Sequence, residues 1–380
     1  MIHIDNRLFN ILSLGLAFGP GSQRAFKIYC QMCEENCFDM PLSEALKLLK
    51  VDGQPRERLS NINKDKISSV VAGCGKESIR ILPIYDADYP VCLKNIPVPP
   101  LVLFIKGVFP DFDGEPAFCI VGPRNVTEFG RKAAFSLARR LAKAGMIIVS
   151  GSASGGDHAA HAGALGVGGR SVMVTADGII TQMNSSNHIL CKQILEKGCI
   201  ISESFPNDVA RKFSFPVRNR ILSGLSLGVA VVEAPVKSGT LITASHAAEQ
   251  GKDVFVVPGT PADKAYKGSN ALLRDGATPL LDVSDIFTRY ISDFPEQIDV
   301  QKAYEEEQNK ALKKNLQKKS PTSLSKEAQL VYNNLVKPEF TTDDLLSLGI
   351  DGSGLLSALT ELEMEHLIKS MPGGTYRISN

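Results

Sequence analysis

The sequence predicts an α/β protein: a Rossmann-like, doubly wound, mostly parallel sheet between a small N-terminal helical domain and a C-terminal winged helix. Three observations support this fold class. Short apolar runs alternate with helix-length segments in the middle of the chain, the beginning shows only helical patterns, and the tail has the pattern of three helices and a hairpin. Because 380 residues exceed one typical domain, we expect a division. The expected parts are a helical domain at 1–80, a sheet domain at 81–295, a linker at 296–322 and a winged helix at 323–380.

The N-terminal part contains a candidate helix-hairpin-helix of the SAM-like kind. Its apolar period runs from Ile11 to Tyr29 and is interrupted by Phe18-Gly19-Pro20-Gly21. A glycine-containing turn of this kind points backbone N–H groups outward and can hold a phosphate. The alternative is a plain turn in an accessory helical bundle, and the sequence leaves both open.

The cysteines of this part approach the spacing of a metal site. Cys30, Cys33 and Cys37 also fall at i, i+3 and i+7, which is one face of a helix. No fourth cysteine or nearby histidine completes a tetrahedral set, so we expect a helix core and no metal.

Six short apolar runs predict the strands of the sheet domain. Helix-length segments such as 131–144 and 159–165 lie between most of them. Strands that are apolar on both faces are typical of a parallel sheet covered by helices on both sides. The runs are residues 101–105, 117–121, 146–149, 172–174, 229–232 and 254–257.

The C-terminal part begins with a polar, lysine-rich stretch at 301–319, for which we expect a solvated linker. Three helical patterns follow the linker, and a turn at 372–374 separates two short apolar stretches. Three helices and a hairpin are the outline of a winged helix, a variant of helix-turn-helix. The helical patterns are residues 327–336, 342–348 and 354–363.

Three strand–loop–helix junctions of the sheet domain share one design, and parallel strands gather such loops at one edge of the sheet. Glycine lets the backbone approach a ligand, and a helix N-terminus offers N–H donors to an anion. None of the loops matches a dinucleotide or P-loop signature. They therefore predict phosphate binding, with turns needed only for packing as the alternative. The candidate contacts are Gly122 and Arg124 in the first loop, Ser150 and Gly151 in the second, and Lys237, Ser238, Gly239 and Thr240 in the third.

A fourth segment, Phe213 to Ile221, combines aromatic and basic residues. Arg218, Asn219 and Arg220 suit phosphate oxygens, and the preceding phenylalanines suit a stacked base. The alternative is that one of the two arginines pairs with an acidic residue of the same domain, Glu203 or Glu233.

Net charge and hydropathy limit the class of protein. The formal net charge of +1 neither favours nor excludes nucleic acid, since one basic cleft suffices for phosphate binding. No apolar stretch is long enough to span a bilayer, and the first ten residues lack the order of a signal peptide. We therefore expect a cytoplasmic protein without membrane contact.

Several motifs of the sheet domain occur together in an informative order. They are VGPRNVTEFG, SGSASGGDHAAHAGAL, SESFP, FPVRNRILSGLS, VVEAPVKSGTLITASHAAEQGKDVFVVPG and KGSNALLRDGA. In this order and spacing the sequence resembles the DprA/Smf family of bacterial DNA-processing proteins. The resemblance covers the sheet domain almost continuously. It implies a homodimer that binds single-stranded DNA and loads RecA recombinase during natural transformation, or competence, without catalysis and without a cofactor.

The same resemblance assigns roles to individual positions. It implies a phosphate contact at Arg124, close approach of DNA at Gly151 and Gly239, and a pocket wall at 218–220. Asp157 and His161 match a motif of the family, although Gly156 stands here where the family usually has isoleucine. A second departure is at 181–184, where the family commonly has a Tyr-Pro pair. A catalytic pair is the alternative for Asp157 and His161, but no nucleophile is evident, so we expect them, with Glu233, to support the pocket.

Two other functions compete with this interpretation. The sheet also resembles nucleoside phosphoribohydrolases of the "lonely guy" type, but Thr240 is followed by Leu241-Ile242-Thr243 and lacks their catalytic glutamate. A transcriptional regulator would read DNA through the winged helix. Its expected recognition helix, 354–363, contains no Lys or Arg and carries Glu361 and Glu363, which suits a protein partner better than phosphates.

Overall fold

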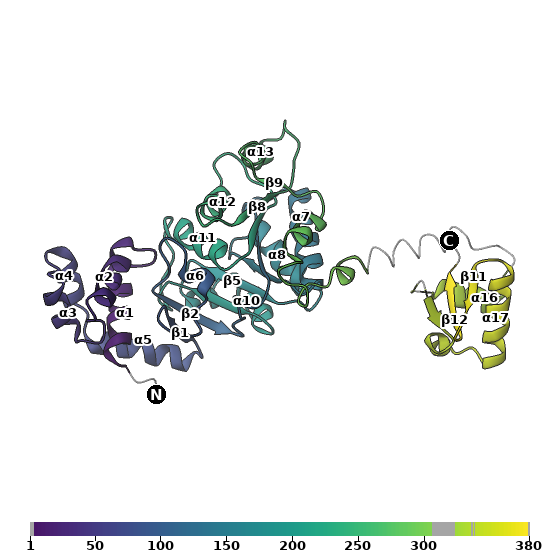
Figure 1. Cartoon of the computed structure of the whole chain (residues 1–380), viewed down its shortest axis with the longest axis horizontal. Helices are drawn as coiled ribbons and strands as arrows, with labels where there is room; N and C mark the ends of the chain where they lie inside the picture. Colours follow the sequence, from purple (N-terminus) through teal and green to yellow (C-terminus); the bar gives the residue numbers. More distant parts are fainter. Residues whose placement is uncertain (1–3, 306–323, 336, 338, 379–380) are drawn as a thin grey trace. The chain divides into compact units, whose positions relative to one another are not determined.

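The computed structural model describes residues 4–305, 324–335, 337 and 339–378. The chain divides into two compact units, Met1–Val300 and Gln301–Asn380 (Figure 1). No helix of the described residues is long and apolar enough to cross a membrane. Most of the predicted linker, including Lys310, Lys313, Lys314, Lys318 and Lys319, lies outside the described residues. The predicted boundaries at residues 80 and 295 stay predictions.

Five helices begin the first unit, and side-chain caps define where the longer ones start. Asp5 accepts a hydrogen bond from the Leu8 N–H (2.8 Å), and Ser22 and Asn63 cap their helices in the same way. Apolar residues of these helices and of the sheet form one continuous core. The helices are α1 (Asn6–Phe18), α2 (Gln23–Glu34), α3 (Leu42–Leu48), α4 (Gln54–Ser60) and α5 (Lys64–Lys76).

The predicted turn between α1 and α2 lies where the sequence places it. Gly19 and Gly21 adopt φ values of 75° and 67°, which suit glycine. The N–H of Gly21 donates to the Glu203 carboxylate (3.0 Å), so this donor is used within the unit. The prediction of a shared helical face for the three cysteines is wrong: α2 ends at Glu34, before Cys37, and Cys33 is exposed.

The sheet has nine strands in the order β1-β2-β6-β5-β4-β3-β7-β8-β9. The seven strands from β6 to β9 in that order pair in parallel, whereas β1–β2 and β2–β6 pair antiparallel. All six predicted strands are present, and the predicted mostly parallel α/β sheet is confirmed. The strands are β1 (Arg80–Pro83), β2 (Val102–Gly107), β3 (Ala117–Val121), β4 (Ile147–Ser150), β5 (Ser171–Thr175), β6 (Cys199–Ser202), β7 (Gly228–Val231), β8 (Asp253–Val256) and β9 (Thr278–Pro279).

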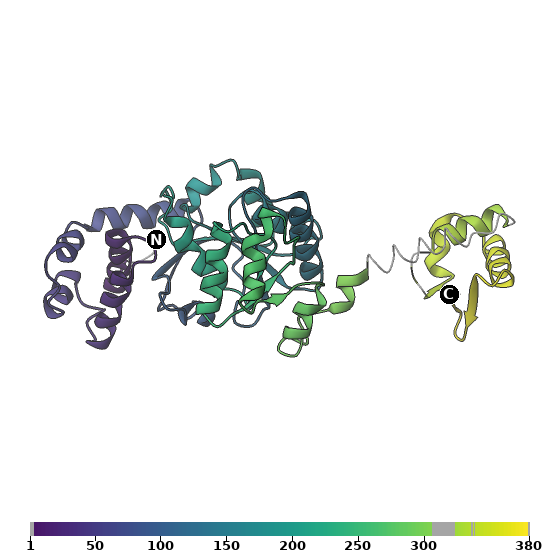
Figure 2. The ribbon, with the colours of Figure 1, turned by 90° about the horizontal axis from the view of Figure 1, so that it is seen from above.

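The strand order reverses between β3 and β7. From β3 the chain steps outward to β4, β5 and β6, then returns through α11 to β7 beside β3 and steps the other way. Right-handed crossovers therefore place α7 and α8 on one face of the sheet and α11 and α12 on the other (Figures 1 and 2). The helices are α6 (Val91–Lys94), α7 (Glu128–Lys143), α8 (Gly156–Leu165), α9 (Ile179–Met183), α10 (His188–Leu195), α11 (Ser214–Gly224), α12 (Gly239–Glu249), η1 (Lys264–Tyr266), α13 (Lys267–Arg274) and α14 (Ser284–Tyr290).

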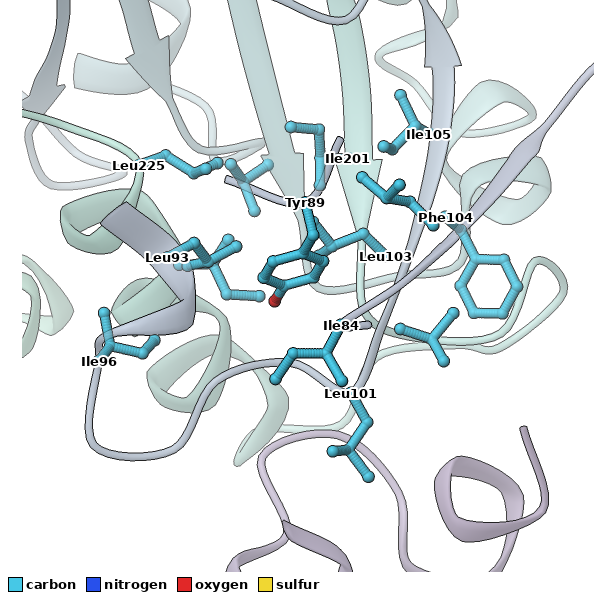
Figure 3. Close-up of a cluster of buried hydrophobic side chains, with 14 of the residues drawn as sticks. Ile84, Tyr89, Leu93, Ile96, Leu101, Leu103, Phe104, Ile105, Ile201 and Leu225 are labelled. Atoms are coloured by element: carbon cyan, nitrogen blue, oxygen red, sulfur yellow. The ribbon is translucent and has the colours of Figure 1, made fainter. Parts of the chain in front are cut away.

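A cluster of buried side chains joins the antiparallel edge of the sheet to the parallel part. Figure 3 shows Tyr89 among Ile84, Leu93 and Leu103, which come from separate segments. The Tyr89 hydroxyl donates to the carbonyl of Pro100 (2.7 Å), so its polar end is satisfied inside the cluster. The cluster lies where β2 pairs with β6 and where α6 contacts α11.

The C-terminal unit has its own hydrophobic core, built around Tyr332, Leu359 and Leu362. Three helical segments and a hairpin occur as predicted, although the middle one is a 3-10 helix, and an additional strand makes the sheet three-stranded in the order β10-β12-β11. Assignment to the winged-helix class stays a prediction. The elements are α16 (Lys326–Asn333), β10 (Glu339–Thr341), η2 (Asp343–Leu348), α17 (Gly352–Met364), β11 (Ile368–Met371) and β12 (Thr375–Ile378).

Candidate functional site

A cleft of about 400 Å³ opens at the carboxyl ends of β3, β4 and β7. It lies where the strand order reverses, which is the usual ligand position in an open α/β sheet. Three loops and helix α11 contribute to its walls. Eight predicted contacts line it: Gly122, Arg124, Arg218, Asn219, Lys237, Ser238, Gly239 and Thr240.

The exposed side of the cleft combines a cation with an aromatic ring. Arg124 follows β3, and its guanidinium carbon lies 4.8 Å from the ring centroid of Phe215, in the first turn of α11. Arg124 and Lys237 are exposed, whereas Phe215 is half-buried. A guanidinium held over a ring stays available to a phosphate, and the ring offers a stacking surface.

The N-terminus of α12 is open toward ligands. Ser238 caps the helix by accepting from the Thr240 N–H (3.2 Å). The N–H of Gly239 has no acceptor among the described residues, and a Cβ at this glycine would meet no atom within 4 Å. Asn219 donates to the Gly239 carbonyl (3.2 Å) and fixes the turn against α11. A free N–H at a helix N-terminus beside Lys237 is suited to an anion.

The first N–H of α8 is used within the protein, because Gly156 donates to the Pro123 carbonyl (3.2 Å). Asp157 lines the cleft, is only 4% exposed, and accepts from the Ala153 N–H (3.3 Å). Burial raises the pKa of Asp157 to about 6, while the positive charges of Arg218 and Arg124 and backbone hydrogen bonds lower it. This group can therefore change its charge in the cleft near neutral pH.

The N-terminus of α7 is also occupied. Glu233, directly after β7, is 1% exposed and accepts from the Thr127 N–H (3.1 Å) and the Thr127 hydroxyl (2.5 Å). Thr127 in turn caps α7 by accepting from the Gly130 N–H (3.0 Å). Glu233 thus ties two loops together beneath the cleft and does not line it.

The two arginines of α11 have different roles. Arg218 is 6% exposed, lines the cleft, and donates to Asn219 Oδ1 (3.1 Å) and to the Val174 carbonyl. Burial lowers its pKa, and the charge of Asp157 opposes the shift. Arg220 pairs with Glu203 (2.8 Å) and does not line the cleft. The pairing that the sequence left open between the two arginines therefore falls on Arg220.

The remaining predicted residues lie behind the cleft. Ser150 is fully buried and donates to the Ile120 carbonyl (2.6 Å), joining β4 to β3. The His161 ring is within hydrogen-bond distance of the Gly151 carbonyl (2.9 Å) and of Ser171 Oγ (2.7 Å). Burial lowers the pKa of His161 to about 4, so the ring is neutral near pH 7. Among the described residues, the His161 ring and the Asp157 carboxylate share no hydrogen bond.

Sequence reasoning did not select several residues of the cleft. Asn125 and Pro123 adjoin Arg124, and Thr243 lies one turn into α12. Adjacency to a candidate and helical spacing from Gly239 were the available signals. The described residues contain no group of three or more His, Cys, Asp or Glu side chains that could hold a metal ion.

Comparisons of sequence agree in where they place similarity. The family model described as DNA recombination-mediator protein A matches residues 80–291. The DNA processing protein DprA of Bacillus subtilis is 39% identical over 222 residues, which are 58% of this chain and 75% of that protein. All elements that form the cleft lie within the matched range.

Comparisons of structure also give proteins named DNA processing protein A. The X-ray structure of DNA processing protein A from Streptococcus pneumoniae is 30% identical with a TM-score of 0.66, covering 76% of this chain and 98% of that chain. A structure of the Helicobacter pylori protein, described as giving insights into its single-stranded DNA binding mode, is 30% identical with a TM-score of 0.49 and covers 54% and 93%. None of these names is that of an enzyme.

Proposed function

Because this chain belongs to the DNA recombination-mediator protein A family, we propose that it binds single-stranded DNA in the cleft at the carboxyl edge of its sheet. The proposal rests on one observation, which is that cations, an aromatic ring and a free helix N-terminus lie together in this cleft. Arg124 lies over the Phe215 ring, and the open N-terminus of α12 lines the same cleft beside Lys237. Cations and free N–H groups suit phosphates, and an accessible ring suits a base.

The shape of the cleft favours a single strand over a duplex. Duplex readers insert a helix or ribbon into a groove, so they present a convex surface to DNA. Here the charged groups line a hollow, which a flexible strand can enter with an unstacked base. The contacts are to phosphate and to a ring face, so binding should have little sequence preference.

The proposal extends to a recombinase partner. A recombination mediator hands a single strand to another protein, so we propose that this one protects incoming DNA and loads RecA during natural transformation, acting as a homodimer in the cytoplasm. The C-terminal unit offers a surface of suitable chemistry for a protein. Helix α17 exposes Leu356 and Met364 (58% and 76%) and carries no basic residue in Gly352–Met364.

The proposal is tested by gel shift of a single-stranded oligonucleotide against the same sequence as duplex, over a series of salt concentrations. We expect tighter binding of the single strand and a steep loss of affinity with salt, because released counterions contribute much of the binding free energy. Equal or tighter duplex binding would contradict the proposal. Binding that does not respond to salt would contradict the phosphate contacts.

A further inference from the structure

A second hollow, of about 580 Å³, runs along the seam between α7 and α8. Its floor is made of small residues of α8, Ala159 and Ala162, and Phe135 of α7 forms a wall. We call it the α7–α8 groove. It is predominantly apolar, yet none of its lining residues belongs to the cleft described above.

Only a short piece of chain separates the groove from the cleft. Pro123 and Arg124 line the cleft, and Gly155 lines the groove. A Cβ on Gly155 would lie 2.4 Å from the carbonyl oxygens of both Pro123 and Arg124. The two loops are therefore in direct contact, so the groove adjoins the cleft beside Arg124.

Phe135 is unusual for its position on α7. The outward stripe of this amphipathic helix has polar or charged residues at Glu128, Arg131, Lys132 and Ser136, whereas the apolar stripe faces the sheet. Phe135 lies in the outward stripe and is 38% exposed. An exposed aromatic ring beside a hollow is the arrangement that stacks a ligand ring.

The charges around the groove fit a polyanion. Lys132 and Arg131 both pair with Glu128, the former at 3.5 Å, and all three side chains are more than half exposed. Two cations share one carboxylate, so a net positive charge remains on this stretch of α7. Solvated pairs of this kind are weak and can exchange their carboxylate for a phosphate.

We propose that the α7–α8 groove is a second nucleotide subsite, in which the DNA strand leaving the cleft stacks a base on Phe135 and places its phosphates near Arg131 and Lys132. This inference rests on the proposed function of the cleft. An apolar peptide is the other ligand that an apolar groove could take. Continuity with the cleft and the cations at the rim favour the DNA strand.

The test measures fluorescence anisotropy with oligothymidylates of two lengths, about 4 and about 16 nucleotides, chosen so that only the longer one can extend beyond the cleft. Phe135→Ala should weaken binding of the longer oligonucleotide about tenfold and leave the shorter one unchanged, while Phe135→Tyr should restore binding. Phe129→Ala is the matched control. Phe129 is on the same helix and 58% exposed, but its ring lies 6.2 Å from Tyr266 and does not line the groove.

Three results would overturn the subsite. The first is unchanged affinity of Phe135→Ala for the longer oligonucleotide, the second is an equal loss on both lengths, and the third is an equal loss in Phe129→Ala. Arg124→Ala, measured alongside, separates this failure from failure of the cleft. If Arg124→Ala weakens both oligonucleotides while Phe135→Ala weakens neither, the cleft stands and the subsite does not. If Arg124→Ala weakens neither, the proposed function itself fails.

Discussion

The junctions that lead into α8 and α12 have the same sequence design and opposite outcomes. Both follow a buried strand, contain glycine and begin a helix at the same edge of the sheet. At α8 the first helical N–H, that of Gly156, donates to the Pro123 carbonyl (3.2 Å), so the protein supplies its own acceptor. At α12 the Gly239 N–H has no acceptor among the described residues, and the space around it is open.

The junction into α7 resembles that of α8, because the Glu233 carboxylate accepts from the N–H and the hydroxyl of Thr127. A glycine-rich turn before a helix therefore indicates where an acceptor can bind. It does not indicate whether the protein or a ligand supplies that acceptor. Acceptors within the protein, the Pro123 carbonyl at α8 and the Glu233 carboxylate at α7, use two helix N-termini, and the third, that of α12, remains open to a ligand. Stability and binding should accordingly respond to different substitutions.

The largest effect is expected on stability, from Glu233→Ala at the N-terminus of α7, where the protein supplies the acceptor. Removal of the carboxylate leaves the half-buried Thr127 N–H without its acceptor, while the Thr127 hydroxyl keeps Tyr266 (3.0 Å), and it opens a cavity between two loops. The free energy of unfolding should therefore fall by about 3 kcal/mol. Urea titration of the sheet domain measures it. Ser238→Ala at the open end is the matched comparison and should cost only about 1 kcal/mol. Equal losses would remove the distinction between an end whose acceptor the protein supplies and an open end.

Arg124→Ala should have the converse effect, on binding rather than on stability. The residue is exposed and its partner in the structure is the Phe215 ring, so its loss should weaken single-strand binding by about tenfold to a hundredfold. The urea midpoint should stay near that of the wild type. An early-melting variant that binds DNA normally would make Arg124 a structural residue and place the site elsewhere.

Asp157→Asn tests the buried carboxylate that lines the cleft. Because the pKa of Asp157 is raised to about 6, its contribution to stability is complete below its ordinary pKa near 3.8 and is lost as pH rises through 6. His161, whose pKa is lowered to about 4, contributes the opposite slope, since its stabilisation is lost as pH falls from 6.5 through 4. The two slopes oppose each other in the wild type. The variant should therefore gain stability with rising pH between 4 and 6.5 more steeply.

The same substitution should also change how binding depends on pH. In the wild type, deprotonation of Asp157 places a negative charge beside the bound phosphate, so affinity for oligothymidylate should fall up to about tenfold as pH rises through 6. Phosphodiesters do not titrate in this range. Asp157→Asn should lack this dependence. A wild-type affinity that is flat with pH would show that the carboxylate does not face the ligand.

The sequence was informative where a pattern is local. Apolar runs predicted six strands, and Gly122, Arg124 and Gly239 lay in loops that the parallel order had to bring together. Long-range pairing was not predictable: nothing local distinguishes Arg220, which pairs with Glu203, from Arg218, which lines the cleft. Strand β9 was missed because two residues form too short a run. Strands β1 and β6 were also missed, although they are as long as the predicted strands β4, β7 and β8. The antiparallel edge depends on strand neighbours and not on composition.

The smallest effect is expected from removal of the tail at Ser320. All groups that form the cleft belong to Met1–Val300, and the second unit has a core of its own, so each should fold without the other. The truncated protein keeps the linker lysines at 310, 313 and 314, and hence any diffuse phosphate contact they make. Single-strand affinity, measured by gel shift, should change less than about threefold.

The sizing column decides how a loss of affinity in that truncation is to be interpreted. If the truncated protein becomes a monomer and binds more weakly, the tail acts through assembly, and the cleft keeps its role. If it remains folded and dimeric but no longer binds single strands, the DNA-binding site lies in the acidic helix α17 or in the hairpin that follows it. The open N-terminus of α12 would then be a feature of the sheet without a ligand, and the contrast with α8 would carry no functional meaning.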